Sequence, residues 1–130
     1  MRTAVCVAFG GALGALARYG LLLALGAPGT GAFPVATFTA NIAGSLFIGA
    51  LGGLLTVRGL PEAWREFLGT GLLGGFTTLS AFGVETVRLA DSGHGTMALV
   101  YAALSIAAGL GAAAAGYAMA RTVLARRDAG

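Results

Sequence analysis

The residues Gly74-Gly75-Phe76-Thr77-Thr78-Leu79-Ser80-Ala81-Phe82 place three hydroxyl groups beside glycines and phenylalanines, within a stretch that otherwise has the composition of a membrane span. The hydrocarbon core of a bilayer offers no hydrogen-bond partners, so polar groups at that depth must find them inside the protein. Such residues are rare in spans and often mark function. We therefore expect this segment to carry the function of the chain.

The composition is that of an integral membrane protein. Of the 130 residues, 57% are hydrophobic, 10% are charged and 23 are glycine, and the mean hydropathy is +0.86. These values lie far from the average of soluble proteins. From Tyr19 to Val57 there is no Asp, Glu, Lys or Arg, whereas a helical span needs only about 20 residues. That run must hold two spans, and residues 26–31, Gly-Ala-Pro-Gly-Thr-Gly, supply the turn between them.

The same length rule predicts a single all-α membrane domain over residues 1–130. Its four expected spans cover residues 4–25, 34–56, 67–89 and 96–123. Small residues four apart, as at Gly10 and Gly14 or at Gly71 and Gly75, would let these helices approach closely. Cys6 is the only cysteine, and we expect it to be a packing residue.

Polar side chains recur on one face of the second expected span. Thr37, Asn41 and Ser45 are four residues apart, so all three project from the same side of a helix. An amide at the depth of Asn41 either joins helices by hydrogen bonds or lines a pore. The residues alone leave both roles open.

The fourth expected span carries a shorter polar series. Tyr101 and Ser105 are four apart, but the next position on that face is Gly109. Taken alone, this series favours a packing role, with the Ser105 hydroxyl bonded to its own helix.

Two charged residues lie inside the expected spans. Arg18, with Tyr19 beside it, either extends to the membrane interface or holds an anion or a partner near a pore mouth. Glu85 follows the central motif, and a buried carboxylate is by default a functional candidate, although a hydrogen-bonded structural role is open.

Three motifs, in their order and spacing, resemble the CrcB/Fluc family of fluoride channels. They are Gly10-Gly11-Ala12-Leu13-Gly14-Ala15-Leu16-Ala17-Arg18-Tyr19, the series from Thr37 through Asn41 to Gly44, Ser45 and Gly49, and the segment from Gly74 to Phe82. The resemblance covers nearly the whole chain. It implies a passive, highly selective channel that exports cytoplasmic fluoride, not an enzyme, in a bacterial or archaeal cell (inner) membrane.

The resemblance also implies an antiparallel, inverted dimer of four-helix subunits with a structural sodium ion at its centre. The third helix should break within Gly74 to Thr78, with the backbone carbonyls of Gly74 and Thr77 as sodium ligands. The residues implied for the anion pathway are Asn41, Ser80, Phe82, Tyr101 and Ser105. Those implied to support it are Arg18, Thr37, Thr78 and Glu85. The implied partners are fluoride, the lipid bilayer and a second copy or an inverted homologous subunit, with no nucleic acid.

Elementary chemistry agrees with these assignments. Fluoride is small and strongly hydrated, so a pore must replace the lost water with donors such as amide and hydroxyl hydrogens. The edge of an aromatic ring carries positive quadrupole charge and can also face an anion. A broken helix exposes carbonyl groups, which a bilayer tolerates only where they meet protein, water or an ion.

Several positions depart from the family pattern. Leu79 and Ala81 stand where phenylalanine and threonine are usual, Leu46 stands where phenylalanine is common, and Gly109 interrupts the hydroxyl series. One pathway through this subunit therefore lacks an aromatic edge and at least one hydroxyl. Either these positions tolerate change, or a partner subunit supplies the missing groups.

The arginines divide unevenly between the two sides of the membrane. With four spans, both termini share one side with the loop between the second and third spans. That side carries Arg2, Arg58, Arg65, Arg121, Arg126 and Arg127. The other side has Arg88, and Arg18 if it extends outward, so the positive-inside rule places both termini in the cytoplasm. A chain that inserts in both orientations should carry nearly equal numbers of arginines on the two sides. We therefore hypothesise that this chain is one member of a fixed-topology pair, whose partner subunit is inverted.

Two other classes of protein fit part of the pattern. A small four-helix multidrug exporter has a similar length, but its proton coupling needs a carboxylate, typically in the first helix, and the first span here has no acid. A non-transporting membrane scaffold would explain the glycines, but it leaves Asn41 and the polar third span without a role.

Overall fold

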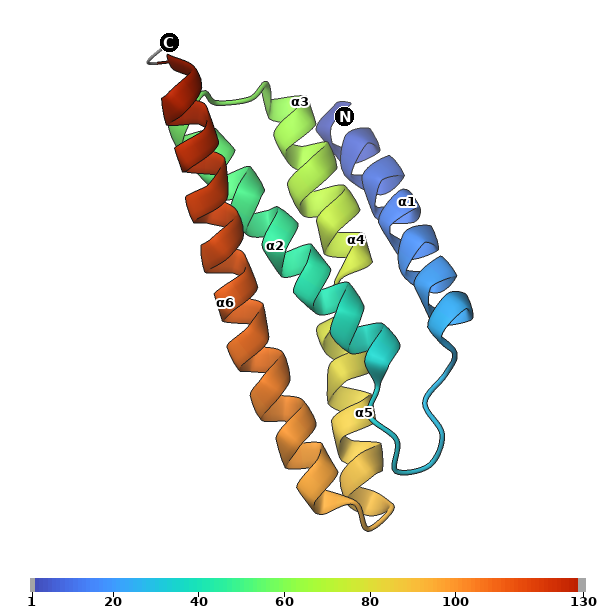
Figure 1. Ribbon diagram of the computed structural model, residues 1–130. Coiled ribbons are helices and arrows are strands. Elements are labelled where there is room, and N and C mark those ends of the chain that lie inside the picture. Colours follow the sequence, from blue (N-terminus) through green and yellow to red (C-terminus); the bar gives the residue numbers. More distant parts are fainter. Residues whose placement is uncertain (1, 129–130) are drawn as a thin grey trace.

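The computed structural model describes residues 2–128, and every regular element in that range is helical (Figure 1). Four helical segments are long and apolar enough to cross a membrane: Thr3–Leu25, Val35–Val57, Glu62–Asp91 and Gly95–Arg126. The expected all-helical class with four long apolar helices is confirmed. The start of α1 and the end of α6 lie at the same end of the bundle (Figure 1).

The first, second and fourth spans are each one helix, whereas the third is built from several pieces. The single helices are α1 (Arg2–Leu25), α2 (Val35–Val57) and α6 (Gly95–Asp128). The third span comprises α3 (Glu62–Arg65), the π-helical η1 (Glu66–Leu73), α4 (Gly74–Phe76) and α5 (Leu79–Asp91).

Glycine and proline set the ends of the first helices. Gly26 follows α1 with φ +80°, a left-handed conformation that favours glycine, and its amide bonds to the Leu22 carbonyl at 2.8 Å. Gly59 follows α2 in the same conformation, with φ +65°. Pro34 and Pro61 immediately precede α2 and α3, where a missing amide hydrogen costs no helical bond.

Thr77 and Thr78 interrupt the third span. Both have extended backbone angles, with φ −81° and ψ 156° at Thr77 and φ −150° and ψ 117° at Thr78. The amide and the hydroxyl of Thr77 each donate to the Leu73 carbonyl at 3.0 Å, which closes the first half. Thr78 caps α5, because its Oγ1 accepts a hydrogen bond from the Ala81 amide at 3.1 Å. The bend expected in the third helix is therefore present, and adjacent threonines end one half and begin the other.

The first half of the third span packs tightly on α1. A methyl group added at Gly14 would lie 2.7 Å from the Phe76 nitrogen, and one at Gly71 would lie 2.9 Å from the Val7 carbonyl oxygen. Gly75 likewise faces the backbone of Gly11. No side chain fits at these contacts, so the spaced glycines of both helices allow their backbones to touch.

The second half of the third span packs on α6, which also runs along α2 (Figure 1). The α2–α6 contact is close, since a methyl group at Gly49 would meet the Ala113 backbone and one at Gly116 would meet that of Leu46. Near the α5 end, Leu89, Ala98 and Tyr101 form a buried core. The break thus carries the third span from one packing partner, α1, to another, α6.

Candidate functional site

The carboxamide of Asn41 braces the break from α2. Its Oδ1 accepts a hydrogen bond from the Thr78 amide at 2.8 Å, and its Nδ2 donates to the Thr78 carbonyl at 3.0 Å. The side chain thus pairs with the backbone of Thr78 as a neighbouring strand would. The sequence left two roles open for Asn41, and the structure shows the one in which the amide joins helices by hydrogen bonds. The carboxamide nitrogen carries two hydrogens, and this contact uses one of them.

Arg18 braces the same break from α1. Its Nε donates to the Gly75 carbonyl at 3.3 Å. In an unbroken helix that carbonyl would accept from the amide of Leu79, so the arginine replaces a donor that the break removes. A cation at a helix C-terminus is also stabilised by the helix dipole. Arg18 therefore holds a partner within the protein instead of extending to the interface.

Glu85 joins three spans near the end of the bundle opposite the start of α1. Thr37 on α2 donates to its Oε1 at 2.7 Å, and Tyr101 on α6 donates to its Oε2 at 2.8 Å. Tyr101 is 0% exposed and Thr37 is 7% exposed, so both hydroxyl groups are withdrawn from the surface. Hydrogen bonds to a carboxylate are among the stronger ones in proteins.

Two aromatic rings pack against the ring of Tyr101. The ring centroids of Phe82 and Tyr101 are 5.2 Å apart with the planes tilted by 49°, and Phe33 meets Tyr101 edge-on at the same distance. Phe82 is partly buried at this contact. The ring therefore lies beside the polar contacts of Glu85 and packs on the core of the bundle.

Ser105 differs from its expected role as a packing residue bonded to its own helix. Its Oγ is buried and has no hydrogen-bond partner within the described part of the chain. It lies one turn beyond Tyr101 on α6. An orphaned buried hydroxyl requires an explanation, because nearly all such groups in folded proteins are satisfied.

The predicted site residues fall into two neighbouring groups. Around the break, Asn41 and Arg18 hold the backbone, while the hydroxyl groups of Thr78 and Ser80 are 3.1 Å apart. The second group contains Thr37, Phe82, Glu85 and Tyr101, with Ser105 one turn away along α6. Gly74 and Ser80 are exposed in the structure, and Leu79 is 82% exposed.

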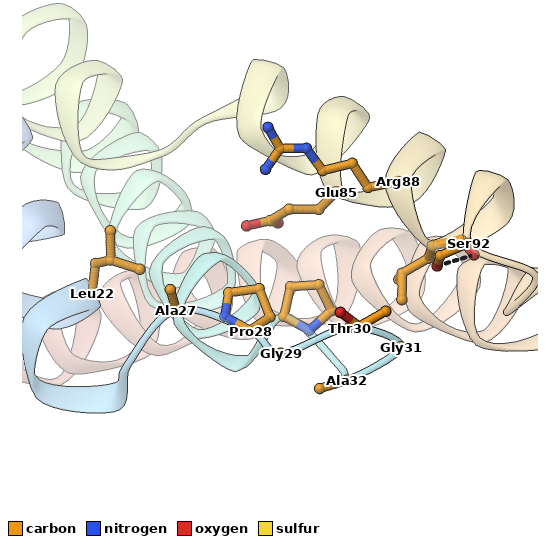
Figure 2. A pocket seen from close by; sticks show the side chains of 12 residues that line it. Leu22, Ala27, Pro28, Gly29, Thr30, Gly31, Ala32, Glu85, Arg88 and Ser92 are labelled. Carbon is orange, nitrogen blue, oxygen red and sulfur yellow. Dashed lines mark hydrogen bonds between the residues drawn. The ribbon is translucent and has the colours of Figure 1, made fainter.

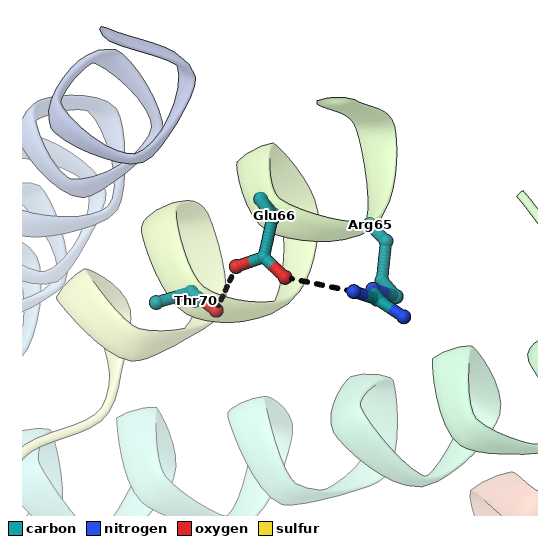
Figure 3. Close-up of polar contacts among 3 residues, drawn as sticks. All are labelled: Arg65, Glu66 and Thr70. Carbon is teal, nitrogen blue, oxygen red and sulfur yellow. Dashed lines mark hydrogen bonds and ion pairs between the residues drawn. The ribbon is translucent and has the colours of Figure 1, made fainter. Parts of the chain in front are cut away.

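A third polar group was not among the predicted site residues. At the start of the third span, Glu66 accepts a hydrogen bond from the Thr70 hydroxyl at 2.7 Å and pairs with Arg65 at 3.3 Å (Figure 3). The spacing of four residues between Glu66 and Thr70 is the signal that would have found it. Arg65 is 54% exposed, so this cluster lies toward the surface, and it is separated from the break by most of η1.

These features define a class of protein. The chain is a four-span membrane protein whose third span is interrupted at mid-length and held by side chains from two other spans. A bilayer tolerates such irregular backbone only where it is buried in protein or lines a polar path, so the class is that of channels and transporters.

The chain belongs to the family described as "CrcB-like protein, Camphor Resistance (CrcB)", whose model matches residues 5–117. It is 51% identical over 102 residues to a "Fluoride-specific ion channel FluC" of Idiomarina loihiensis, covering 78% of this chain and 76% of that protein. A channel of the same name from Methylobacterium nodulans is 44% identical over 122 residues, covering 93% and 98%. "Fluoride-specific ion channel FluC 2" of Bacillus subtilis is 46% identical over 110 residues, covering 85% and 81%.

Proposed function

We propose that this protein is a passive, fluoride-selective channel that releases cytoplasmic fluoride and works as an antiparallel dimer. The observation that carries the proposal is the interrupted third span, whose break is braced by Asn41 and Arg18 and borders a series of hydroxyl groups. Two relatives that are 51% and 44% identical to this chain are named as fluoride-specific ion channels. No step of passive conduction requires a covalent intermediate or an energy source.

The chemistry of the proposed anion pathway is that of donors replacing water. Asn41 retains one carboxamide hydrogen beyond its bond to Thr78, and Ser80 contributes a hydroxyl group at the start of α5. Phe82 offers a ring edge next to Tyr101. The orphaned hydroxyl group of Ser105 supports an ion path here, since an anion passing that point would accept its hydrogen bond.

The backbone at the break fits a small hard cation such as sodium. In an unbroken helix the Gly74 carbonyl would accept from the Thr78 amide, but that amide is bonded to Asn41. Thr77 has extended angles, so its carbonyl also leaves the helical pattern. Carbonyl oxygens freed in this way are suitable ligands for sodium, and we assign Gly74 and Thr77 to that role. When bound, the cation would hold the break and a facing subunit together.

Apolar surface left open by the single subunit supports a dimer. An apolar groove of about 710 Å³ runs between α2, η1 and α6. It is lined by residues such as Leu51, Leu72 and Val123. Leu79, at the start of α5, is 82% exposed. An inverted second copy or homologous subunit would bring its own α5 toward this groove, and its side chains would complete the pathway at Leu79 and Ala81.

The test is fluoride efflux from liposomes containing the protein, alone or with its inverted partner. Efflux should proceed without a proton gradient and chloride should be strongly excluded. Phe82→Ala should slow efflux, because it removes the ring edge proposed to face the anion, and Asn41→Ala should also slow it, because it removes a hydrogen-bond donor. Cys6→Ser is the matched control and should conduct like the unmodified protein.

Two results would count against this function. If efflux required a proton gradient, the protein would be a coupled exporter, and the buried carboxylate of Glu85 would be the group to examine. If no anion crossed the membrane either with the chain alone or with its inverted partner present, a non-transporting membrane scaffold would be the remaining interpretation.

A further inference from the structure

The last turns of α6 extend beyond the end of α2. The two helices run in the same direction (Figure 1), and a methyl group added at Gly53 on α2 would lie 2.6 Å from the Tyr117 carbonyl oxygen on α6. One turn further along each helix come Val57, where α2 ends, and Arg121. From there α6 continues to Asp128, which is about 10 Å further. A span needs only about 20 residues and α6 has 34, so these last turns lie at the depth of the lipid headgroups.

Arg121 is held in place at this depth by an aromatic ring. Its guanidinium carbon lies 5.6 Å from the centroid of the Tyr117 ring, one turn earlier on α6, which is a cation–π contact. The ring itself rests beside α2, since a methyl group added at Gly52 would lie 3.8 Å from its Cδ2. Among the residues that the structure describes, no carboxylate lies within the ion-pair distance of 4.0 Å from the Arg121 guanidinium. The charge is therefore positioned by the protein but has no paired anion.

The arginine side chains of α6 lean toward the bilayer. Side chains on a helix are tilted toward its N-terminus, and for the end of α6 that direction leads back into the membrane. Arg121 and Arg126 are both exposed, so their guanidinium groups meet the lipid side of the surface. The Thr122 hydroxyl between them donates to the Ala118 carbonyl of its own helix. The arginines are therefore the donors that this segment offers to a ligand.

The chemistry of this end of the bundle fits a lipid phosphate group. A guanidinium presents a planar fork of N–H donors that matches two phosphate oxygens, and tyrosine is enriched at the depth of the headgroups. Arg58, which follows the last residue of α2, adds positive charge at nearly the same level. Glu66, an acid at this end, is already paired with Arg65 at 3.3 Å. A lipid with a net negative charge gains from this field, whereas the ammonium group of a zwitterionic lipid cancels the gain.

We infer that the end of α6 is a binding surface for an anionic phospholipid, in which Arg121, supported by the Tyr117 ring, binds the lipid phosphate and Arg126 adds to the attraction. The surface lies at the end of the bundle that carries most of the arginines, away from the break and its hydroxyl groups. It is a property of this chain that does not depend on whether the protein conducts ions.

The experiment measures the binding of phosphatidylglycerol and of phosphatidylcholine to the full chain in detergent, by native mass spectrometry over a range of lipid concentrations. The unmodified protein should bind phosphatidylglycerol more tightly. Arg121→Gln should weaken that binding by about fivefold, which corresponds to about 1 kcal/mol for one basic residue at a membrane surface. Adding Arg126→Gln should weaken it further. Binding of phosphatidylcholine should change little in either variant.

Two controls separate a specific surface from net charge. Arg88→Gln removes an exposed arginine at the opposite end of the bundle, where its side chain extends from α5 beside that of Glu85 (Figure 2), and it should leave the binding of phosphatidylglycerol unchanged. Tyr117→Leu keeps every arginine but removes the ring beneath Arg121, so it should also weaken the binding. Tyr117→Phe keeps the ring and should bind like the unmodified protein.

The inference is overturned if the unmodified protein binds both lipids equally, or if Arg121→Gln and Tyr117→Leu both bind phosphatidylglycerol as tightly as the unmodified protein. It is also overturned if Arg88→Gln weakens the binding as much as Arg121→Gln does, because the lipid would then respond only to net charge. Fluoride efflux plays no part in these measurements, so the proposed channel function stands or falls independently of their outcome.

Discussion

At the scale of single residues, one carboxamide holds the irregular backbone of the third span. The amide and carbonyl of Thr78 have no helical partners, and Asn41 supplies an acceptor and a donor to the same residue. Leaving a backbone group unpaired inside a membrane protein costs more free energy than a typical hydrogen bond contributes to stability. Asn41 is therefore structural even if its remaining hydrogen also faces an ion.

Replacing Asn41 by alanine should destabilise the folded protein. The substitution removes two hydrogen bonds and leaves the Thr78 backbone unsatisfied, at a cost of about 1–3 kcal/mol. The measurement is the melting temperature in detergent. Ser45→Ala, one turn away on the same face of α2, is the control and should shift it far less. Equal melting temperatures for Asn41→Ala and Ser45→Ala would show that the brace contributes little.

The polar residues of the site were visible in the sequence, but their contacts were not. Hydroxyl, amide and carboxyl groups within apolar runs stand out by composition, so the sequence identifies Asn41, Glu85 and Tyr101 as candidates. Their partners are 37, 48 and 16 residues away along the chain, and spacing within one helix carries no information at such separations. The expectation that the Ser105 hydroxyl bonds to its own helix was wrong, because a local rule gave it a partner that the packing does not provide.

At the scale of elements, the sequence predicted the bend of the third span but not the form of its halves. The resemblance to the family, carried by the segment from Gly74 to Phe82, placed the break within Gly74 to Thr78. The π-helical form of η1 had no signal in the pattern of polar residues. The donation from Arg18 depends on where α1 crosses the third span, and only the folded arrangement determines that.

The close contact of α2 with α6 yields a prediction at this scale. Gly49→Leu should disrupt the bundle, because even a methyl group there would meet the backbone of Ala113, and backbone cannot move aside as a flexible side chain can. Overpacking typically costs about 1–3 kcal/mol and sometimes more. Folded yield in detergent, followed by size-exclusion chromatography, measures the effect.

Gly20→Leu is the matched control for Gly49→Leu. Gly20 also lies within a span, on α1, but a methyl group there meets nothing within 4 Å. If both variants gave the yield of the unmodified protein, the α2–α6 contact would not need glycine.

At the scale of the whole molecule, the chain on its own leaves much of its apolar surface uncovered. Of the residues in the most apolar part of each span, only 11% to 17% are buried within the subunit. Lipid covers part of this surface, but lipid cannot form hydrogen bonds with the polar backbone at Gly74, which is exposed. That exposed backbone is the reason to expect a second subunit.

The arginine bias predicts a fixed orientation in the membrane. When the chain is expressed alone in cells, a reporter at either terminus should respond only on the cytoplasmic side, because most arginines share that side with the termini. Accessibility of the termini to a membrane-impermeant label, before and after cell lysis, provides the measurement. Equal labelling from both sides, together with robust efflux by the purified single chain, would contradict a fixed-topology pair.

The two halves of the third span pack on different helices, α1 and α6, and this determines the order in which they can dock during synthesis. A ribosome releases the chain from its N-terminus, so η1 and α4 emerge after α1, the helix against which they pack. The helix α5 emerges before α6 exists, and Glu85 then has Thr37 as a donor but not Tyr101. A nascent chain arrested ahead of α6 would hold a third span whose second half contacts α2 but lacks α6. Assembly is therefore completed by the last helix to be made.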